Sequence, residues 1–274
     1  MSKFELIIEP DKTIKNFWKE LWQYRDLFYF LAWRDVLVRY KQTVIGIAWS
    51  VLRPLLTMIV FTIIFGKIAK LPSGDIPYPL LVFAAMIPWQ FFSNTFSEAS
   101  NSLINNTQLI SKVYFPRIII PTTAMIVSLI DFAVSFAIFI ILMLWYGVMP
   151  DIKICLLPLL LLMAILTSLG AGYIISALNV KYRDFRYVVP FIVQFGLYIS
   201  PVGFSSSVIP EKWRMLYSLN PMVGVIDGFR WCLLGKDISI FWPGFIISIG
   251  FAIFLFLFGI MYFNKTERSF ADII

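Results

Sequence analysis

The stretch "IIIPTTAMIVSLIDFAVSFAIFIILMLWY" (residues 118–146) contains a single charged residue, Asp131, among its 29 residues. A helix needs about 20 mostly apolar residues to cross a bilayer, and this stretch is long enough. Lipid accepts only helices and closed barrels, because each unpaired backbone group in the hydrocarbon costs several kcal/mol. The stretch lacks the alternation of a barrel strand, so it predicts a membrane-spanning helix.

Five more segments have the same apolar character, and we predict that each of them is a spanning helix. They cover about residues 45–66, 79–97, 154–178, 188–206 and 240–263. The whole chain is 59% hydrophobic and 14% charged, whereas soluble domains contain about 25% charged residues. The sequence therefore predicts an all-α integral membrane protein with six transmembrane helices in one domain, residues 1–274.

The Lys and Arg residues predict the orientation of the chain. If the N-terminus is cytoplasmic, 16 of the 23 basic residues fall on the cytoplasmic side, which the positive-inside rule favours. Both termini, residues 98–117 and the turn "NVKYRDFRYVVP" (179–190) then face the cytoplasm.

Residues 10–41 precede the first span and form an amphipathic pattern. Ile14, Phe17, Trp18 and Leu21 recur at helical spacing, with lysines on the opposite face. The pattern predicts an interface helix that lies in the headgroup layer. The alternative is a cytoplasmic helix that packs on a soluble partner.

Residues 205–239 are predicted to lie outside the cell. Pro210 and Pro221 divide this region into two pieces, 211–219 and 222–234, which are too short to span a bilayer. We predict a re-entrant or capping pair of helices, for which a gate is the natural use. A simple lid over the helix bundle is the alternative.

Several chemistries find no support in the sequence. No phosphate-binding loop occurs, so ATP, if it drives the protein, is hydrolysed by another chain. Histidine is absent, which removes the commonest general base and metal ligand. Cys155 and Cys232 lie in apolar surroundings and are expected to be buried inert thiols, with a disulfide as the alternative. Asp131 lies within a span and is expected to be a protonated or hydrogen-bonded structural residue, with a coupled-transport carboxylate as the alternative.

Five motifs together resemble the permease subunits of bacterial ABC exporters for O-antigen, capsule and teichoic acid. They are "RYKQTVIGIAWSVLRPLLTMIVFTIIFGKI" (39–68), "NVKYRDFRYV" (179–188), "ISPVGF" (199–204), "LNP" (219–221) and "GFRW" (228–231). Each motif alone is weak, but their order and spacing over nearly the whole chain are specific for the family. They do not specify the glycan.

The resemblance implies a transport subunit rather than an enzyme. Two permeases would form a channel in the bacterial inner membrane and bind two ATPase subunits in the cytoplasm. ATP and Mg²⁺ would bind to those ATPases, and this chain would hold no cofactor. The cargo would be a lipid-linked polysaccharide, and no nucleic acid partner is expected.

Three groups of candidate residues follow from this organisation. The ATPase-coupling candidates are Asn105, Gln108, Lys112, Tyr114, Arg183, Asp184, Phe185 and Arg186. A diphosphate-lipid headgroup favours basic residues near the cytoplasmic entrance, and the candidates there are Arg34, Arg39, Lys41 and Arg53. The outer gate and glycan-contact candidates are Tyr198, Phe204, Trp213, Tyr217, Arg230 and Trp231.

Three rival functions share parts of this pattern. An ABC permease for small amphiphiles, such as a drug or lipid exporter, has the same six spans. A membrane enzyme acting on lipid-linked sugars needs clustered acids or histidines, which the sequence does not offer. A secondary transporter is expected to show inverted repeats, and none is evident in the sequence.

Overall fold

The computed structural model describes residues 22–41, 46–72, 74, 76–149, 152–182, 184–235, 238–267 and 270, with the backbone alone for 46–50. Within these ranges the chain forms helices and no strand. In chain order the elements are α2 (Arg25–Lys41), α3 (Gly46–Phe61), η1 (Thr62–Ile68), α4 (Tyr78–Asn105), α5 (Thr107–Lys112), α6 (Ile119–Trp145), η2 (Ile152–Leu156), α7 (Leu157–Lys181), α8 (Phe185–Ile199), η3 (Ser206–Val208), α9 (Glu211–Tyr217), α10 (Pro221–Leu234) and α11 (Trp242–Glu267).

The all-α membrane fold predicted from the sequence is confirmed. A helix lies at each of the six predicted positions, and four in the described ranges are long and apolar enough to cross a membrane. These four are Val51–Ile68, Ile119–Trp145, Ile152–Lys181 and Trp242–Glu267. The helix α8 is apolar but contains only 15 residues.

The predicted bounds of the fifth span were wrong. We expected a helix over about 188–206, but α8 begins at Phe185 and contains Pro190 within it. Pro190 is the sixth residue of α8, past the four whose amides lack a helical partner, so it removes one backbone hydrogen bond from the helix, which membrane helices tolerate. The helix ends at Ile199, and Ser200 is already extended.

The helix α4 lies at the centre of the bundle. It packs against α3, α6, α7, α8 and α10, and most of its side chains are buried. Its polar residues are accommodated because they bond to the helix itself: Ser93 Oγ donates to the Gln90 carbonyl and Ser102 Oγ to the Ala99 carbonyl. Surrounding helices rather than lipid cover α4, so this helix needs less hydropathy than its neighbours.

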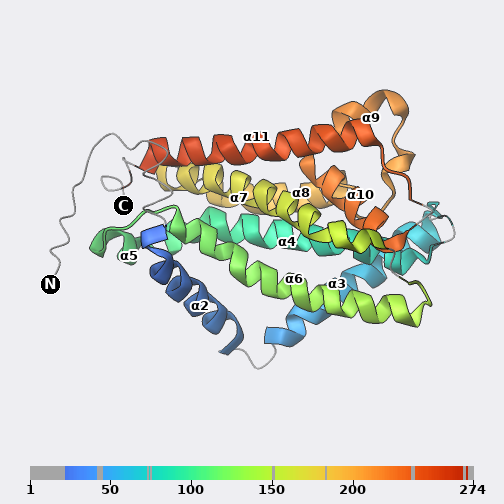
Figure 1. The fold of residues 1–274 in the computed structure, drawn as a ribbon, viewed down its shortest axis with the longest axis horizontal. Coiled ribbons are helices and arrows are strands. Elements are labelled where there is room, and N and C mark those ends of the chain that lie inside the picture. Colours follow the sequence, from blue (N-terminus) through green and yellow to red (C-terminus); the bar gives the residue numbers. More distant parts are fainter. Residues whose placement is uncertain are drawn as a thin grey trace.

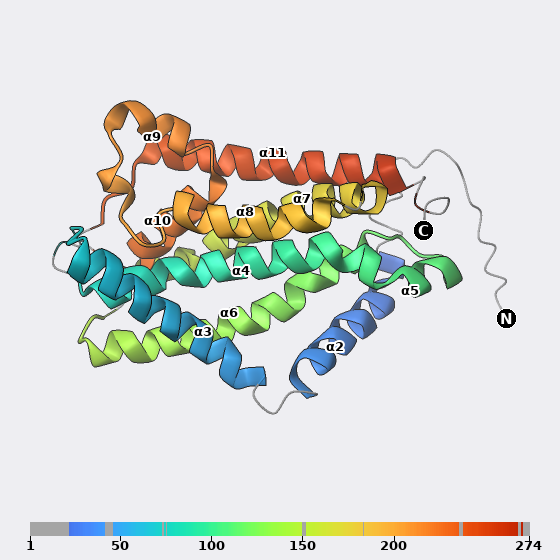
Figure 2. The same cartoon turned by 180° about the vertical axis from the view of Figure 1, so that it is seen from behind.

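The bundle has two structurally different ends (Figures 1 and 2). At one end lie α5, the end of α7 and the end of α11. There the amide of Arg117 donates to Glu267 Oε1 at 2.8 Å, which joins the start of α6 to α11. At the other end lie α9, α10 and the end of α6. The two predicted non-spanning pieces, 211–219 and 222–234, correspond to α9 and α10.

The most extensive helix contact, between α7 and α11, depends on two glycines. A Cβ at Gly170 would lie 2.7 Å from the carbonyl carbon of Leu255, and one at Gly259 would collide with the Gly170 carbonyl oxygen. Small residues allow two backbones to approach closely, and membrane helices gain van der Waals packing in this way. These two positions therefore set how closely α7 and α11 can pack.

The helix α2 packs along α6 and buries Leu31 and Ala32. It forms the described part of the predicted interface helix 10–41, and residues 10–21 lie outside the described residues. Its placement in the headgroup layer remains a prediction. Both cysteines are free. Cys232 is buried as expected, but Cys155 is exposed, so the expectation that it is buried was wrong.

Candidate functional site: an inner cavity and an outer gate

A cavity of about 270 Å³ with a mixed polar and apolar lining opens between α3, α4, α6 and α8. Gln90, Ser93 and Asn94 line it from α4, and Ser135 lines it from α6. Arg39 from α2 and Arg53 from α3 contribute two positive charges, whereas Asp131 is the one acidic residue among the described residues of its wall. Hydrogen-bonding groups and an excess of positive charge suit this cavity to an anionic, polar ligand.

Asp131 forms an ion pair with the interface helix. Arg39 Nη2 lies 2.7 Å from Asp131 Oδ2, and the Tyr40 hydroxyl donates to Asp131 Oδ1 at 2.6 Å. The side chain of Asp131 is 11% exposed and that of Arg39 is 36% exposed. The prediction of a hydrogen-bonded carboxylate is therefore confirmed for Asp131, and two residues of α2 are its partners.

A second cavity of about 500 Å³ lies between α2, α4 and α6, toward the end that carries α5. Arg34, Asp35, Glu98 and Asn106 are among its lining residues, and Arg39 lines both cavities. Arg39 Nη1 is 3.8 Å from Glu98 Oε1 on this side. Arg39 therefore lies where the two cavities meet, between one carboxylate in each.

The structure brings three of the four headgroup candidates to this pair of cavities. Arg34 donates to Asp35 Oδ1 at 2.7 Å and to Asn106 Oδ1 at 3.0 Å, and it lines the second cavity. Arg53 is exposed and forms no ion pair with any residue in the described ranges. Lys41 is exposed at the end of α2 and does not line either cavity in the described part of the chain.

At the opposite end, Arg230 joins three segments of the outer gate. Its guanidinium donates to the carbonyls of Leu81 at 3.0 Å, Phe204 at 2.8 Å and Val202 at 3.0 Å. The residue is only 2% exposed. Burial lowers the pKa of the Arg230 guanidinium, and the nearby carboxylate of Asp227 opposes that shift. The structure therefore places Arg230 inside the gate as an anchor and not on a surface that a glycan could reach.

Three other side chains hold the same loop, residues 199–204. The Tyr78 hydroxyl donates to the Gly203 carbonyl at 2.6 Å, and the Tyr217 hydroxyl donates to the Ile199 carbonyl at 2.7 Å. Asn220 Nδ2 donates to Ser200 Oγ at 3.0 Å. We call the loop 199–204 with Tyr78, Tyr217, Asn220 and Arg230 the outer knot. Three motifs that are separate in the sequence, "ISPVGF", "LNP" and "GFRW", meet in it.

The remaining gate candidates fall into two groups. Tyr198 and Trp213 are exposed, at 59% and 52%. Trp231 is half-buried, with Lys153 Nζ 5.0 Å from its ring and the Trp242 ring 6.0 Å away. Phe204 is half-buried and supplies its carbonyl to the outer knot. Tyr198 and Trp213 are thus the aromatic candidates that the structure leaves accessible.

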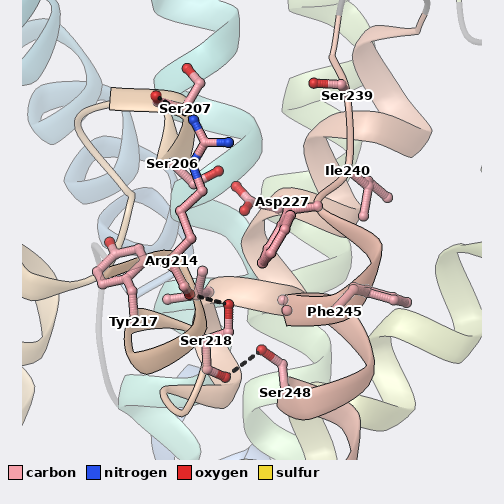
Figure 3. Close-up of a pocket in the computed structure, with 14 residues that line it drawn as sticks. Ser206, Ser207, Arg214, Tyr217, Ser218, Asp227, Ser239, Ile240, Phe245 and Ser248 are labelled. Atoms are coloured by element: carbon pink, nitrogen blue, oxygen red, sulfur yellow. Dashed lines mark hydrogen bonds between the residues drawn. The ribbon is translucent and has the colours of Figure 1, made fainter. Parts of the chain in front are cut away.

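A pocket of about 210 Å³ lies beside the outer knot, between α9, α10 and α11 (Figure 3). Ser248 Oγ donates to the Ser218 carbonyl at 2.8 Å, and Ser218 Oγ donates to the Arg214 carbonyl at 2.7 Å. The Arg214 guanidinium donates to the carbonyls of Ile209 and Ser207. These bonds fasten α9 to α11 and to the segment before it.

The coupling candidates lie at the other end of the bundle, where they are largely accessible (Figure 1). Asn105, Gln108, Lys112 and Tyr114 are exposed around α5, and Asp184 and Arg186 are exposed at the start of α8. Phe185 is half-buried beside Tyr182, with ring centroids 6.4 Å apart. Arg183 lies outside the described residues.

The model of the ABC-2 type transporter family matches residues 26–234 of this chain. The chain belongs to this family. The match runs from α2, through both cavities and the coupling end, to the end of α10, so it includes all three groups of candidate residues but not α11.

Curated relatives of the permease agree with this assignment. The O-antigen export system permease protein of Klebsiella pneumoniae is 28% identical over 250 residues, which cover 91% of this chain and 95% of the relative. The corresponding protein of Myxococcus xanthus is 28% identical over 215 residues, 77% of this chain and 82% of the relative. The polysialic acid transport protein of Escherichia coli is 26% identical over 214 residues, 75% and 80% of the two chains.

Sequence reasoning missed several residues of the permease that the structure places at these sites. Tyr40, Glu98, Gln90 and Asn94 were not singled out, although Glu98 and Asn94 interrupt an apolar pattern in α4. The partner of Asp131 lies 92 positions away, and no local pattern connects the two. A single acid in an apolar span was a signal that a basic partner exists, because an unpaired charge there is costly.

Proposed function

We propose that this permease exports a lipid-linked polysaccharide, of the O-antigen type, from the cytoplasmic to the outer side of the bacterial inner membrane. Two copies would form the channel, and two ATPase subunits on the cytoplasmic side would drive it. The relatives that cover most of both chains are named as O-antigen export permeases, which supports this substrate class. The positive-inside pattern supports cytoplasmic termini.

The observation that carries the proposal is the inner cavity with its two arginines. A lipid-linked glycan carries an anionic headgroup, and arginine binds phosphate with two parallel hydrogen bonds. The cavity offers Arg39 and Arg53 together with amide and hydroxyl groups from α4 and α6. In this proposal Arg34 and Arg39 meet the headgroup from the cytoplasmic side, and Arg39 and Arg53 hold it in the inner cavity.

The exposed faces of α3 and α8 support a channel between two copies. Both helices lie on the side toward the viewer in Figure 2, and α8 buries only Val189. Arg53 of α3 and Gln194 of α8 are exposed, and so are the aromatic rings of Phe191 and Phe195 on α8. Polar side chains that face lipid are costly, so a second permease or a wet channel is the better neighbour for this face. Accessible aromatic rings suit contact with sugar rings.

The coupling end supports an ATPase partner of complementary shape and charge. The exposed residues of α5 and the start of α8 form a mixed polar and aromatic surface at one end of the bundle. Asp184 and Arg186 offer charges that determine register, and the half-buried Phe185 offers an apolar contact. Motion of the ATPases would enter the permease here.

The test has two steps in the strain that carries the gene. The permease is purified with a tag, and the co-purifying ATPase is identified. The gene is then deleted and surface glycan is measured with and without a plasmid copy. We expect an ATPase to co-purify, and we expect surface glycan to disappear on deletion and to return with the plasmid. Intact surface glycan together with increased sensitivity to small amphiphiles would favour the rival reading, a drug or lipid exporter.

A further inference from the structure

Arg39 and Asp131 form an ion pair in the wall of the inner cavity, where a bound anion would compete with the carboxylate for the guanidinium. We propose that Asp131 is an internal substitute for the anionic headgroup: a lipid diphosphate displaces the carboxylate from Arg39 when it binds, and the carboxylate takes Arg39 back when the headgroup leaves. This inference rests on the proposed function for the source of the diphosphate, but the exchange itself is a property of the permease alone.

The charges in the cavity are arranged for such an exchange. Arg39 and Arg53 line the wall, while Asp131 is the one acid among its described residues. One positive charge therefore remains when Asp131 is paired with Arg39. A diphosphate that contacts both arginines would meet two positive charges once the carboxylate has withdrawn. The ion pair lies at the edge of about 270 Å³ of space, so a ligand has room to approach it.

The two oxygens of Asp131 have different partners, which allows one to be released. Arg39 lies against Oδ2, whereas the Tyr40 hydroxyl donates to Oδ1. When a phosphate takes the guanidinium, the bond from Tyr40 still satisfies the carboxylate. A buried carboxylate that loses its last partner would be strongly destabilised, and the hydroxyl avoids that outcome.

Arg39 lies between the two cavities and lines both of them. Its side chain is 36% exposed, and Glu98 Oε1 lies 3.8 Å from Nη1 on the side of the second cavity. Asp131 Oδ2 lies 2.7 Å from Nη2 on the side of the inner cavity. Arg39 would accept an anion from the cytoplasmic side and pass it to the inner cavity. Throughout this step either Glu98, Asp131 or the anion would remain as its charged partner.

The exchange has a structural consequence for α2. Arg39 and Tyr40 lie at the end of α2, and the Asp131 ion pair ties that end to α6. Binding of the headgroup to Arg39 would replace the ion pair between Arg39 and Asp131 of α6. The binding of cargo would thereby release the end of α2 that precedes α3, the helix on the proposed channel face.

The test measures anion binding to the purified permease in nanodiscs, without ATPase or glycan. The ligand is inorganic pyrophosphate, and the discs are made with neutral lipid. Asp131→Asn removes the competing charge but keeps an oxygen that can accept the bond from Tyr40. We expect it to tighten pyrophosphate binding at least about tenfold, which corresponds to the lower end of measured coupling energies for close charge pairs. Glu211→Gln removes one negative charge on exposed α9 and should leave binding unchanged.

The double variant Arg39→Gln with Asp131→Asn separates exchange from a general charge effect. If Asp131 acts through Arg39, the gain from Asp131→Asn disappears in the Arg39→Gln background. Equal pyrophosphate affinity in wild type and Asp131→Asn, or no binding in either, would overturn the proposal. Thermal unfolding of each variant in the same discs shows that the fold is retained.

Two further measurements are needed. One identifies the source of the anion, and the other distinguishes failure of this inference from failure of the proposed function. Discs that contain phosphatidylglycerol should compete weakly with pyrophosphate, whereas a polyprenyl diphosphate in the disc should compete strongly. Equal competition by phosphatidylglycerol would overturn the assignment to a diphosphate. Normal pyrophosphate exchange with no effect of gene deletion on surface glycan would refute the proposed export function alone, and normal export without exchange would refute this inference alone.

Discussion

Two arginines, Arg39 beside the middle of α6 and Arg230 in the gate at the end that carries α9, have different kinds of partners. Arg230 is 2% exposed and donates to three backbone carbonyls from two segments. Arg39 is paired with the side-chain carboxylate of Asp131, and a second carboxylate lies 3.8 Å away. A backbone carbonyl is held in place by the fold, whereas a side-chain carboxylate can rotate away from its partner. The same residue type therefore acts as an anchor in the gate and as an exchangeable site at the inner cavity.

The comparison predicts that the two residues fail in different ways when they are replaced. Loss of the anchor should damage the fold, and loss of the exchangeable site should damage transport in a folded protein.

Replacement of the anchor, Arg230→Met, should cause the largest loss of stability. Three carbonyls would lose their donor, and each unpaired buried group costs about 1–3 kcal/mol, so we expect a loss of about 3 kcal/mol or more. The measurement is thermal unfolding of the purified permease in detergent. The control, Arg214→Met, removes two carbonyl bonds at a half-exposed site and should shift the midpoint less. Equal shifts would contradict the assignment of Arg230 as the anchor.

Replacement of the exchangeable residue, Arg39→Gln, should reduce glycan export while the protein stays folded. A charged hydrogen bond to phosphate is worth about 1.5–3 kcal/mol, so export in the deletion strain should fall about tenfold or more. Surface glycan is measured at equal permease levels in the membrane. Lys41→Gln, two positions further along on α2 and away from both cavities, serves as the control. An Arg39→Gln permease that exports as well as the control would refute a role for the cavity.

Charge reversal at the coupling end, Asp184→Arg, should weaken ATPase recovery by about fivefold. The residue is exposed at the start of α8, and exposed ion pairs are worth up to about 1 kcal/mol. The measurement is the ratio of ATPase to permease after tag purification. Glu211→Arg makes the same charge change at the other end of the bundle and should leave the ratio unchanged.

The smallest predicted effect concerns the packing of α8 on α4. A Cβ at Gly196 would lie 2.6 Å from Trp89 Cη2, so Gly196→Ala should cost about 1 kcal/mol through crowding. The thermal midpoint reports the change. Gly250→Ala in α11 has open space around the new methyl group and should not destabilise the permease. A Gly196→Ala permease as stable as wild type would show that α8 is free to shift on α4.

The sequence was sufficient for the helices but not for the pairs between them. Apolar runs such as 118–146 predicted α6 almost to the residue, because the bilayer imposes length and composition on each span separately. The gate pieces were also predicted, since Pro210 and Pro221 limit them locally. The extent of α4 beyond residue 97 was missed, because its polar end packs on protein and not on lipid.

Long-range partners could not be predicted from single elements. The sequence indicated that Arg39 and Asp131 were each unusual, but their pairing depends on how α2 lies against α6. Arg230 was predicted to belong to the outer gate or to contact glycan, from its position in an outer motif, but its burial depends on three segments meeting at one point. Both results come from tertiary packing, which periodicity and composition do not encode.

The inner cavity is proposed to bind the headgroup of the cargo, and site-specific photo-crosslinking tests this binding in cells. A benzoylphenylalanine placed at Gln90, a half-buried residue of the cavity wall, is irradiated in cells that synthesise the glycan. We expect a permease adduct that carries glycan at position 90 and none at Phe254, which is 57% exposed on α11. Glycan adducts of equal yield at both positions, or phospholipid adducts alone at position 90, would contradict the claim.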